Sequence, residues 1–149
     1  MKYTEKISNK LNELLEKNYD AEKGYLNSAE NVESAKLKIF FKNRASERSM
    51  FAKDLRTEIL SYGQIPEDDG SFKGTMHRNW MTLKSLFSSN DEEAILEEAL
   101  RGEKASFEEY EEILKEESFA PSTRKMLDEQ KLKIQAAINS LKLEEHLAS

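Results

Sequence analysis

Four side chains with oxygen ligand atoms stand in the apolar stripes of four long segments. They are Glu22, Glu47, Glu103 and Gln130. A carboxylate placed inside a protein core is costly unless a cation compensates its charge. In a helix bundle, carboxylate oxygens from facing helices can bind a pair of metal ions and so offset this cost. These four residues are therefore a candidate metal site.

Two arginines offer the same carboxylates a different partner. Arg44 lies three residues before Glu47, and Arg48 directly follows it. Both can neutralise Glu22 and Glu47 without any metal ion. In this interpretation the inward charges form a buried salt-bridge network that sets the register of the helices. The sequence leaves both interpretations open.

The first two segments that must position these side chains are amphipathic helices, because apolar residues recur in them every three or four positions. The first is expected over Thr4–Glu30. The second begins with Ser34 as its N-cap and ends before Gly63. Together they form an antiparallel hairpin, and Glu22 and Glu47 lie equally far from its turn.

Two further long helices follow the same apolar spacing. Asn90, with Glu93 three residues later, is expected to cap the third, which stops before Pro121. Ser122 is expected to cap the fourth. In this second hairpin, Glu103 and Gln130 are not equally far from the turn. Gln130 therefore matches the level of its partner less well than Glu22 matches Glu47.

A long connection separates the two hairpins. It starts as a polar loop, Gln64–Ser71, and continues as a shorter amphipathic stretch, Phe72–Phe87. A connection of this length is long enough to cross the full height of a bundle, as in bundles with one crossover. We expect one all-α domain over residues 1–149, with an additional helix in the crossover between the second and third long helices.

Composition limits the function classes. The chain has 23 basic and 29 acidic residues, a net charge of −6 and no cysteine. The acidic balance disfavours general nucleic-acid binding, and the missing cysteines exclude thiol catalysis and Cys-based zinc sites. No apolar run approaches the ~20 residues of a membrane span. We expect a cytoplasmic protein with neither a nucleic-acid nor a membrane partner.

The remaining candidate residues favour ordinary structural roles. His77 and Trp80 are expected to anchor the crossover helix on the bundle rather than to form an anion site. The methionines are expected to pack in the core rather than to bind a soft metal. They are Met50, Met76, Met81 and Met126. None of these features assigns a substrate or a reaction.

The layout resembles the ferritin superfamily. Ferroxidase centres of that superfamily use a Glu on the first helix, Glu-x-x-His on the second, a Glu on the third and, in some members, a Gln on the fourth. The matching residues are Glu22, Glu47, Glu103 and Gln130, with Met50 where the second-helix His would stand. The last helix, with Gln130 in the run EQKL, also lacks the Glu-x-x-His of the di-iron oxidases.

A second resemblance spans nearly the whole chain. Residues 70–80 (GSFKGTMHRNW), 47–48 (ER) and 100–103 (LRGE) are similar to a bacterial ferritin-like family of unknown function. It implies a ferritin-like four-helix bundle and supplies no reaction. The leading interpretation is a non-catalytic or weakly metal-binding bundle that acts through binding or assembly. Bundles of this kind pair through helix faces, so a homo-oligomer is a further expectation, and the protein partner is unknown.

Two alternatives stay open at this point. One is an iron or manganese carboxylate oxidase or ferroxidase-type protein that uses Glu22, Glu47 and Glu103. The other is a purely structural helical module with a buried salt-bridge network. The missing histidines favour the structural and assembly interpretations, whereas the inward glutamates on three helices favour the metal interpretation.

Overall fold

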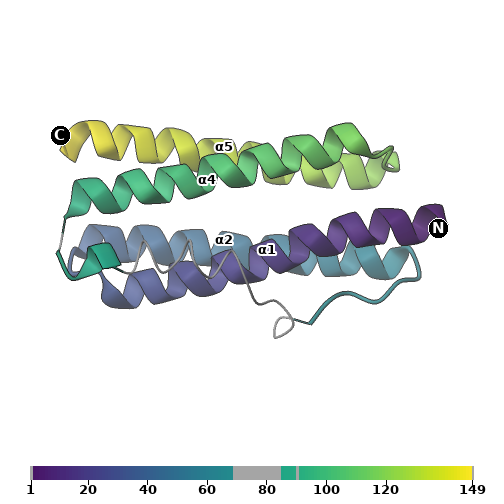
Figure 1. The fold of residues 1–149 in the computed structure, drawn as a ribbon, viewed down its shortest axis with the longest axis horizontal. Coiled ribbons are helices and arrows are strands. Elements are labelled where there is room, and N and C mark those ends of the chain that lie inside the picture. Colours follow the sequence, from purple (N-terminus) through teal and green to yellow (C-terminus); the bar gives the residue numbers. More distant parts are fainter. Residues whose placement is uncertain (1, 69–84, 90, 149) are drawn as a thin grey trace.

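Four long helices lie side by side in the computed structural model, which describes residues 2–68, 85–89 and 91–148 (Figure 1). The helices are α1 (Tyr3–Asn31), α2 (Ala35–Ser61), α4 (Glu92–Glu116) and α5 (Pro121–Ala148). Within these ranges there is no strand. The expected all-α fold class is confirmed.

The helices are arranged as two antiparallel pairs. α1 packs closely on α2, and α4 packs closely on α5, whereas the backbones of the two pairs approach each other closely mainly between α2 and α5. In Figure 1, α2 and α4 run in the same direction, because the chain leaves α2 at one end of the bundle and enters α4 at the other. The connection between them therefore traverses the height of the bundle.

The described start of this connection lies along α1. The amide N–H of Glu67 donates to the side-chain oxygen of Asn12 at 2.8 Å, and the Asn12 amide donates to the carbonyl of Ile65 at 3.3 Å. The Tyr19 hydroxyl donates to the Glu67 carbonyl at 3.3 Å. Of the helix expected over 72–87, only residues 85–87 are described, and these are helical. The remainder, with His77, Trp80, Met76 and Met81, lies outside the described residues.

Two of the expected helix boundaries of the first hairpin are confirmed. The Ser34 side chain accepts a hydrogen bond from the amide of Leu37 at 3.2 Å, which satisfies a free donor at the start of α2. Gly63, just beyond the C-cap of α2, has a φ of 76°. A residue with a side chain would be strained in this left-handed conformation, so glycine suits the end of the helix.

Two expected boundaries of the second hairpin are wrong, by one residue at α4 and by two residues at α5. Asp91 caps α4, and its carboxylate accepts from the amide of Ala94 at 3.1 Å. Asn90 itself lies outside the described residues. α5 begins at Pro121, so Ser122 lies inside the helix and does not cap it. Proline suits a first helical position because its fixed φ is helical and its missing N–H needs no partner there.

The apolar stripes of all four helices meet in one core. Among the largest fully buried side chains are Phe41, Phe51, Leu11, Leu127 and Ile134. The expected core position of Met50 is wrong, because its side chain is 59% exposed. Met126 is partly buried and packs against the core. None of the described helices carries an apolar stretch that could span a lipid bilayer.

Candidate functional site: a buried polar network

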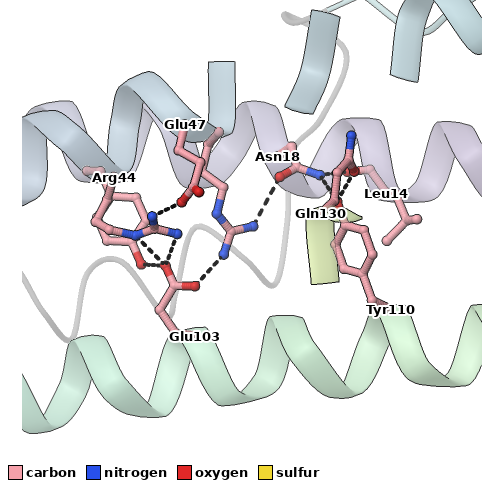
Figure 2. A network of polar contacts seen from close by, with 9 residues as sticks. Leu14, Asn18, Arg44, Glu47, Glu103, Tyr110 and Gln130 are labelled. Atoms are coloured by element: carbon pink, nitrogen blue, oxygen red, sulfur yellow. Dashed lines mark hydrogen bonds and ion pairs between the residues drawn. The ribbon is translucent and has the colours of Figure 1, made fainter. Parts of the chain in front are cut away.

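Glu103 is the centre of a polar network inside the apolar core. It lies on α4 and is fully buried, with 0% of its surface exposed. Arg48 of α2 donates to its Oε2 at 2.8 Å, and Arg44 of α2 donates to its Oε1 at 3.3 Å. The hydroxyl of Tyr25 on α1 also donates to Oε1. One carboxylate thus links three of the four helices (Figure 2).

Glu47 completes the charged part of the network. It lies on α2 and forms an ion pair with Arg44 at a position where 21% of the Glu47 side chain is exposed. The network therefore contains two positive and two negative groups, and its formal charge sums to zero. A balanced set of this kind avoids the largest penalty of burial, which falls on a charge left without a partner.

Arg48 carries the network from Glu103 toward the middle of the bundle. Its Nη1 donates to the side-chain oxygen of Asn18 on α1 at 3.0 Å. The Asn18 amide group donates in turn to the hydroxyl of Tyr110 at 3.1 Å and to the carbonyl of Leu14 at 2.8 Å. Within the described part of the chain, the buried Nε–H of Arg48 has no acceptor.

The fourth helix joins through Gln130. The Tyr110 hydroxyl donates to the Gln130 side-chain oxygen at 2.6 Å, and the Gln130 amide donates to the backbone carbonyl of Phe51 at 3.4 Å. The chain of contacts runs from Glu47 on α2 through α4 and α1 to Gln130 on α5 (Figure 2). It ends at the backbone of Phe51, which returns it to α2. Hydrogen bonds between buried polar groups thus connect all four helices.

Burial and charge act on Glu103 in opposite directions. Burial raises the pKa of its carboxyl, but the positive charges of Arg48 and Arg44 and the Tyr25 hydroxyl outweigh burial and hold the pKa below its ordinary value. For Arg48, burial lowers the pKa, and the negative charge of Glu103 more than offsets this, so its pKa lies above the ordinary value. Both groups are therefore charged throughout the neutral range.

The two tyrosines of the network keep their protons. Burial, followed by the charge of Glu103, raises the pKa of Tyr25 far above its ordinary value. Burial raises the pKa of Tyr110 to about 12. Both hydroxyls are thus hydrogen-bond donors near neutral pH, and neither is poised to release a proton. General acid–base catalysis needs a group that titrates near the working pH, and these four groups do not supply one.

The structure brings three of the four candidate metal-site residues into the network, two of them in its buried part. Glu103 is its centre and Gln130 is one of its ends, whereas Glu47 lies at its partly exposed edge. Glu22 is half-buried, and no contact joins its carboxylate to the network. Arg44 and Arg48 neutralise Glu103 rather than Glu22.

A metal ion does not fit this arrangement as it stands. Both oxygens of Glu103 accept hydrogen bonds from guanidinium groups, and the oxygen of Gln130 accepts from Tyr110. Across residues 2–68, 85–89 and 91–148, no three His, Cys, Asp or Glu side chains lie close enough together to hold a metal ion. The assignment of Glu22, Glu47, Glu103 and Gln130 as metal ligands remains a prediction.

Tyr25 and Tyr110 were not expected in a polar role, because both occur at the helical spacing of ordinary core residues. The sequence feature that indicates the buried network is the position of two arginines. Arg44 and Arg48 lie on the same stripe of α2 as Phe41 and Leu55, so they had to be buried. A buried arginine needs several acceptors, and its neighbours on facing helices are where such acceptors are found.

The lowered pKa of Glu103 predicts an acid-sensitive fold. In the unfolded chain this carboxyl takes up a proton near its ordinary pKa of about 4.3. In the folded chain it does so only at lower pH. Glu103 therefore stabilises the fold fully above about pH 4.3, and this stabilisation is lost as the pH falls through the folded-state pKa.

Denaturant titrations from pH 7 to pH 3 check this expectation. The free energy of unfolding of the wild type should fall below about pH 4.3. The difference between the wild type and Glu103→Gln should narrow over the same range, because glutamine does not titrate. A difference that stays constant down to pH 3 would contradict the assigned state of Glu103.

Fold and site together define an all-helical bundle whose four helices are joined by a charged network in the core. Over residues 6–116 the chain matches a family described as "Domain of unknown function (DUF2383)". The match spans most of the chain, and the chain belongs to this family. A search of curated proteins gives no match. The matched range includes Asn18, Tyr25, Arg44, Arg48 and Glu103, and it ends at the last residue of α4.

Proposed function

We propose that the protein is a non-catalytic, ferritin-like helical bundle that acts through binding or assembly, and that its buried charges hold the bundle together instead of binding a metal. The observation that carries the proposal is the state of Glu103. Its two oxygens are taken by Arg44, Arg48 and Tyr25. Glu103, Arg48 and Tyr25 each keep one protonation state near neutral pH.

The topology supports the ferritin-like part of the proposal. α2 and α4 run in the same direction and are joined by a connection that traverses the bundle. Bundles with a single long crossover have this arrangement, whereas in up-down-up-down bundles all consecutive helices are antiparallel and are joined by short loops. The bacterial and cytoplasmic setting, the additional helix in the crossover and the single domain over residues 1–149 stay predictions.

The iron or manganese oxidase and ferroxidase interpretation is the alternative that an experiment must exclude. It would require Arg44 and Arg48 to leave Glu103, and it would leave two buried guanidinium groups without a carboxylate. Such a rearrangement is costly, because separating a buried ion pair exposes both partners to an apolar surrounding. The purely structural module differs from our proposal only in lacking a partner.

Metal content separates these functions. We expect protein purified without chelator to contain much less than one equivalent of iron or manganese. The same result is expected after anaerobic addition of Fe(II) or Mn(II), because guanidinium groups occupy the carboxylate oxygens. Elemental analysis after gel filtration measures both.

The matched variants are Glu47→Ala, in the candidate set, and Glu98→Ala, on the outer side of α4 beside the exposed Arg101. Stoichiometric uptake that Glu47→Ala abolishes and Glu98→Ala preserves would overturn the proposal and establish a metal site. Equal, weak uptake in all three proteins is the expected outcome.

A further inference from the structure

The two helix pairs carry charges of opposite sign where they meet. We call α1 and α2 the N-terminal hairpin, and α4 and α5 the C-terminal hairpin (Figure 1). Among the described residues, six ion pairs join the two hairpins, and in each of them the cation belongs to the N-terminal hairpin and the anion to the C-terminal hairpin. These pairs are Lys6–Glu117, Lys10–Glu116, Lys17–Glu109, Lys36–Glu144, Arg44–Glu103 and Arg48–Glu103.

The sequences of the two hairpins have the same bias. Residues 1–63 include 12 basic and 10 acidic side chains, whereas residues 91–149 include 8 basic and 16 acidic side chains. The net charges of these two segments are therefore +2 and −8. Opposite charges attract more strongly at low ionic strength, because dissolved salt screens the interaction between exposed charges. The attraction between the hairpins thus depends on the salt concentration.

The ion pairs lie both at the edges of the boundary between the hairpins and in the core. Where α1 meets α4, Lys17 is 3.0 Å from Glu109, and where α2 meets α5, Lys36 is 2.6 Å from Glu144. Water reaches all four of these side chains, at least in part. The pairs of Glu103 are buried and are therefore screened much less. Salt acts mainly on the pairs at the edges.

Packing is closer within each hairpin than between the two. The backbone of α1 follows that of α2, and the backbone of α4 follows that of α5, whereas the two hairpins approach each other closely mainly between α2 and α5. The four helices have between 25 and 29 residues. This is well above the ~12–15 residues below which isolated helices are marginal in water. We therefore expect each hairpin to keep its helices when it separates from the other.

The buried part of the boundary resists separation less than an apolar boundary of the same size. Arg48 and Glu103 lose their hydration when the hairpins close over them, and this loss is comparable to the attraction between the two charges. The buried Nε–H of Arg48 has no acceptor among the described residues. Water would satisfy this donor once the hairpins separate, which lowers the cost of opening.

We propose that the two hairpins separate from each other as intact units, and that ionic strength controls how often they do so. At low ionic strength the ion pairs at the edges hold the hairpins together. At high ionic strength these pairs are screened, and the apolar faces of both hairpins become accessible more often. The closed form remains the major one, because all four helices share one apolar core. Separation requires neither a metal ion nor a partner, and it is independent of the proposed function.

A single buried cysteine measures this opening even when it is rare. The chain has no cysteine of its own. Ala99 is buried on α4 four positions before Glu103, so both side chains point toward the N-terminal hairpin. In the full-length variant Ala99→Cys, the rate of thiol labelling divided by the rate in the unfolded chain gives the opening constant, provided that closing is faster than labelling. Ala137→Cys, seven positions after Gln130 on α5, is a second reporter and should give a similar constant.

The backbone amides of the helices provide the reference. If the hairpins separate with their helices intact, the opening constant of the thiol should be at least roughly tenfold larger than that of the most protected amides, measured by hydrogen exchange in the same variant. Between about 50 mM and about 0.5 M NaCl, the constant of the thiol should rise about fivefold as the edge pairs are screened. Equal constants for thiol and amides, as complete unfolding would give, overturn the proposal. So does a constant of the thiol that NaCl leaves unchanged.

Charge reversal tests whether the edge pairs control the opening. In the Ala99→Cys background, Lys17→Glu with Lys36→Glu should raise the opening constant at least roughly tenfold, because two attractions across the boundary become repulsions. Adding Glu109→Lys and Glu144→Lys exchanges the charges of both pairs and should restore most of the original value. An opening constant that stays high after this exchange contradicts control by these ion pairs.

The matched control is Lys42→Glu with Lys53→Glu in the same background. Both lysines are exposed on the outer side of α2, away from its buried stripe, and their reversal changes the net charge by the same amount. At about 0.1 M salt, this control should leave the opening constant within about twofold of the original value, because distant exposed charges are screened. An increase as large as that of the boundary variant would mean that total charge governs the opening, and it would overturn the proposal.

Discussion

Replacing Glu103 by glutamine is expected to lower the free energy of unfolding by about 3–5 kcal/mol. Glutamine keeps the shape of the side chain but removes the negative charge that faces Arg44 and Arg48. Arg48 is then left as a buried cation whose remaining partner is the uncharged Asn18. A domain has roughly 5–15 kcal/mol of total stability, so the loss is a large part of the whole.

Glu98→Gln is the matched control. Glu98 is on the same helix and is also paired with an arginine, but that arginine, Arg101, has a side chain that is 65% exposed. A surface pair of this kind contributes at most about 1 kcal/mol. Urea titration of both variants gives the two losses. Equal losses would mean that Glu103 is not held as a buried ion in solution.

Much of the fold could be predicted because it depends on local patterns. The three-to-four spacing of apolar residues located all four long helices, and α1 and α2 begin and end within one residue of their expected positions. Ser34 and Gly63 were identifiable since a cap and a left-handed residue each require a particular side chain. At the second hairpin, Asp91 stands beside the expected cap Asn90 and qualifies equally well, whereas α5 begins at Pro121, ahead of the expected cap Ser122.

The candidate site was predicted in part. Helical spacing placed Glu103 and Gln130 inside, because an inward position is a property of one helix. It did not reveal which cation each carboxylate meets, because that depends on how the two helix pairs are stacked. Arg44 and Arg48 were expected to meet Glu22 and Glu47. Arg44 does pair with Glu47, but both arginines also reach across to Glu103, and neither meets Glu22.

The exposure of Met50 has a related cause. Its apolar type indicated a core position, but its place on α2 is nearly opposite to the buried stripe that contains Arg48 and Leu55. Side-chain chemistry and helical phase thus disagreed at this residue. The angular position on the helix determined whether the side chain is buried, as it did for the arginines. In this chain the arginines, whose type contradicts their inward phase, form the buried network.

The second large effect is the recovery of stability when both members of the central ion pair are removed. Glu103→Leu alone leaves Arg48 buried without a carboxylate, whereas Arg44 keeps Glu47 as its partner. Adding Arg48→Met removes the stranded charge and fills the space with an apolar side chain. The double variant should therefore be more stable than Glu103→Leu by about 2 kcal/mol, even though Asn18 loses a hydrogen bond.

The comparison variant is Arg44→Met in the same Glu103→Leu background. It should recover less, because Arg44 is still neutralised by Glu47 when Glu103 is absent, and removing Arg44 then leaves Glu47 unpaired. Denaturant titration of the two double variants measures the difference. If both recover the same stability, the charges act as one diffuse cluster. The larger recovery with Arg48 would show that the Arg48–Glu103 contact between α2 and α4 is the specific link that joins the two helix pairs.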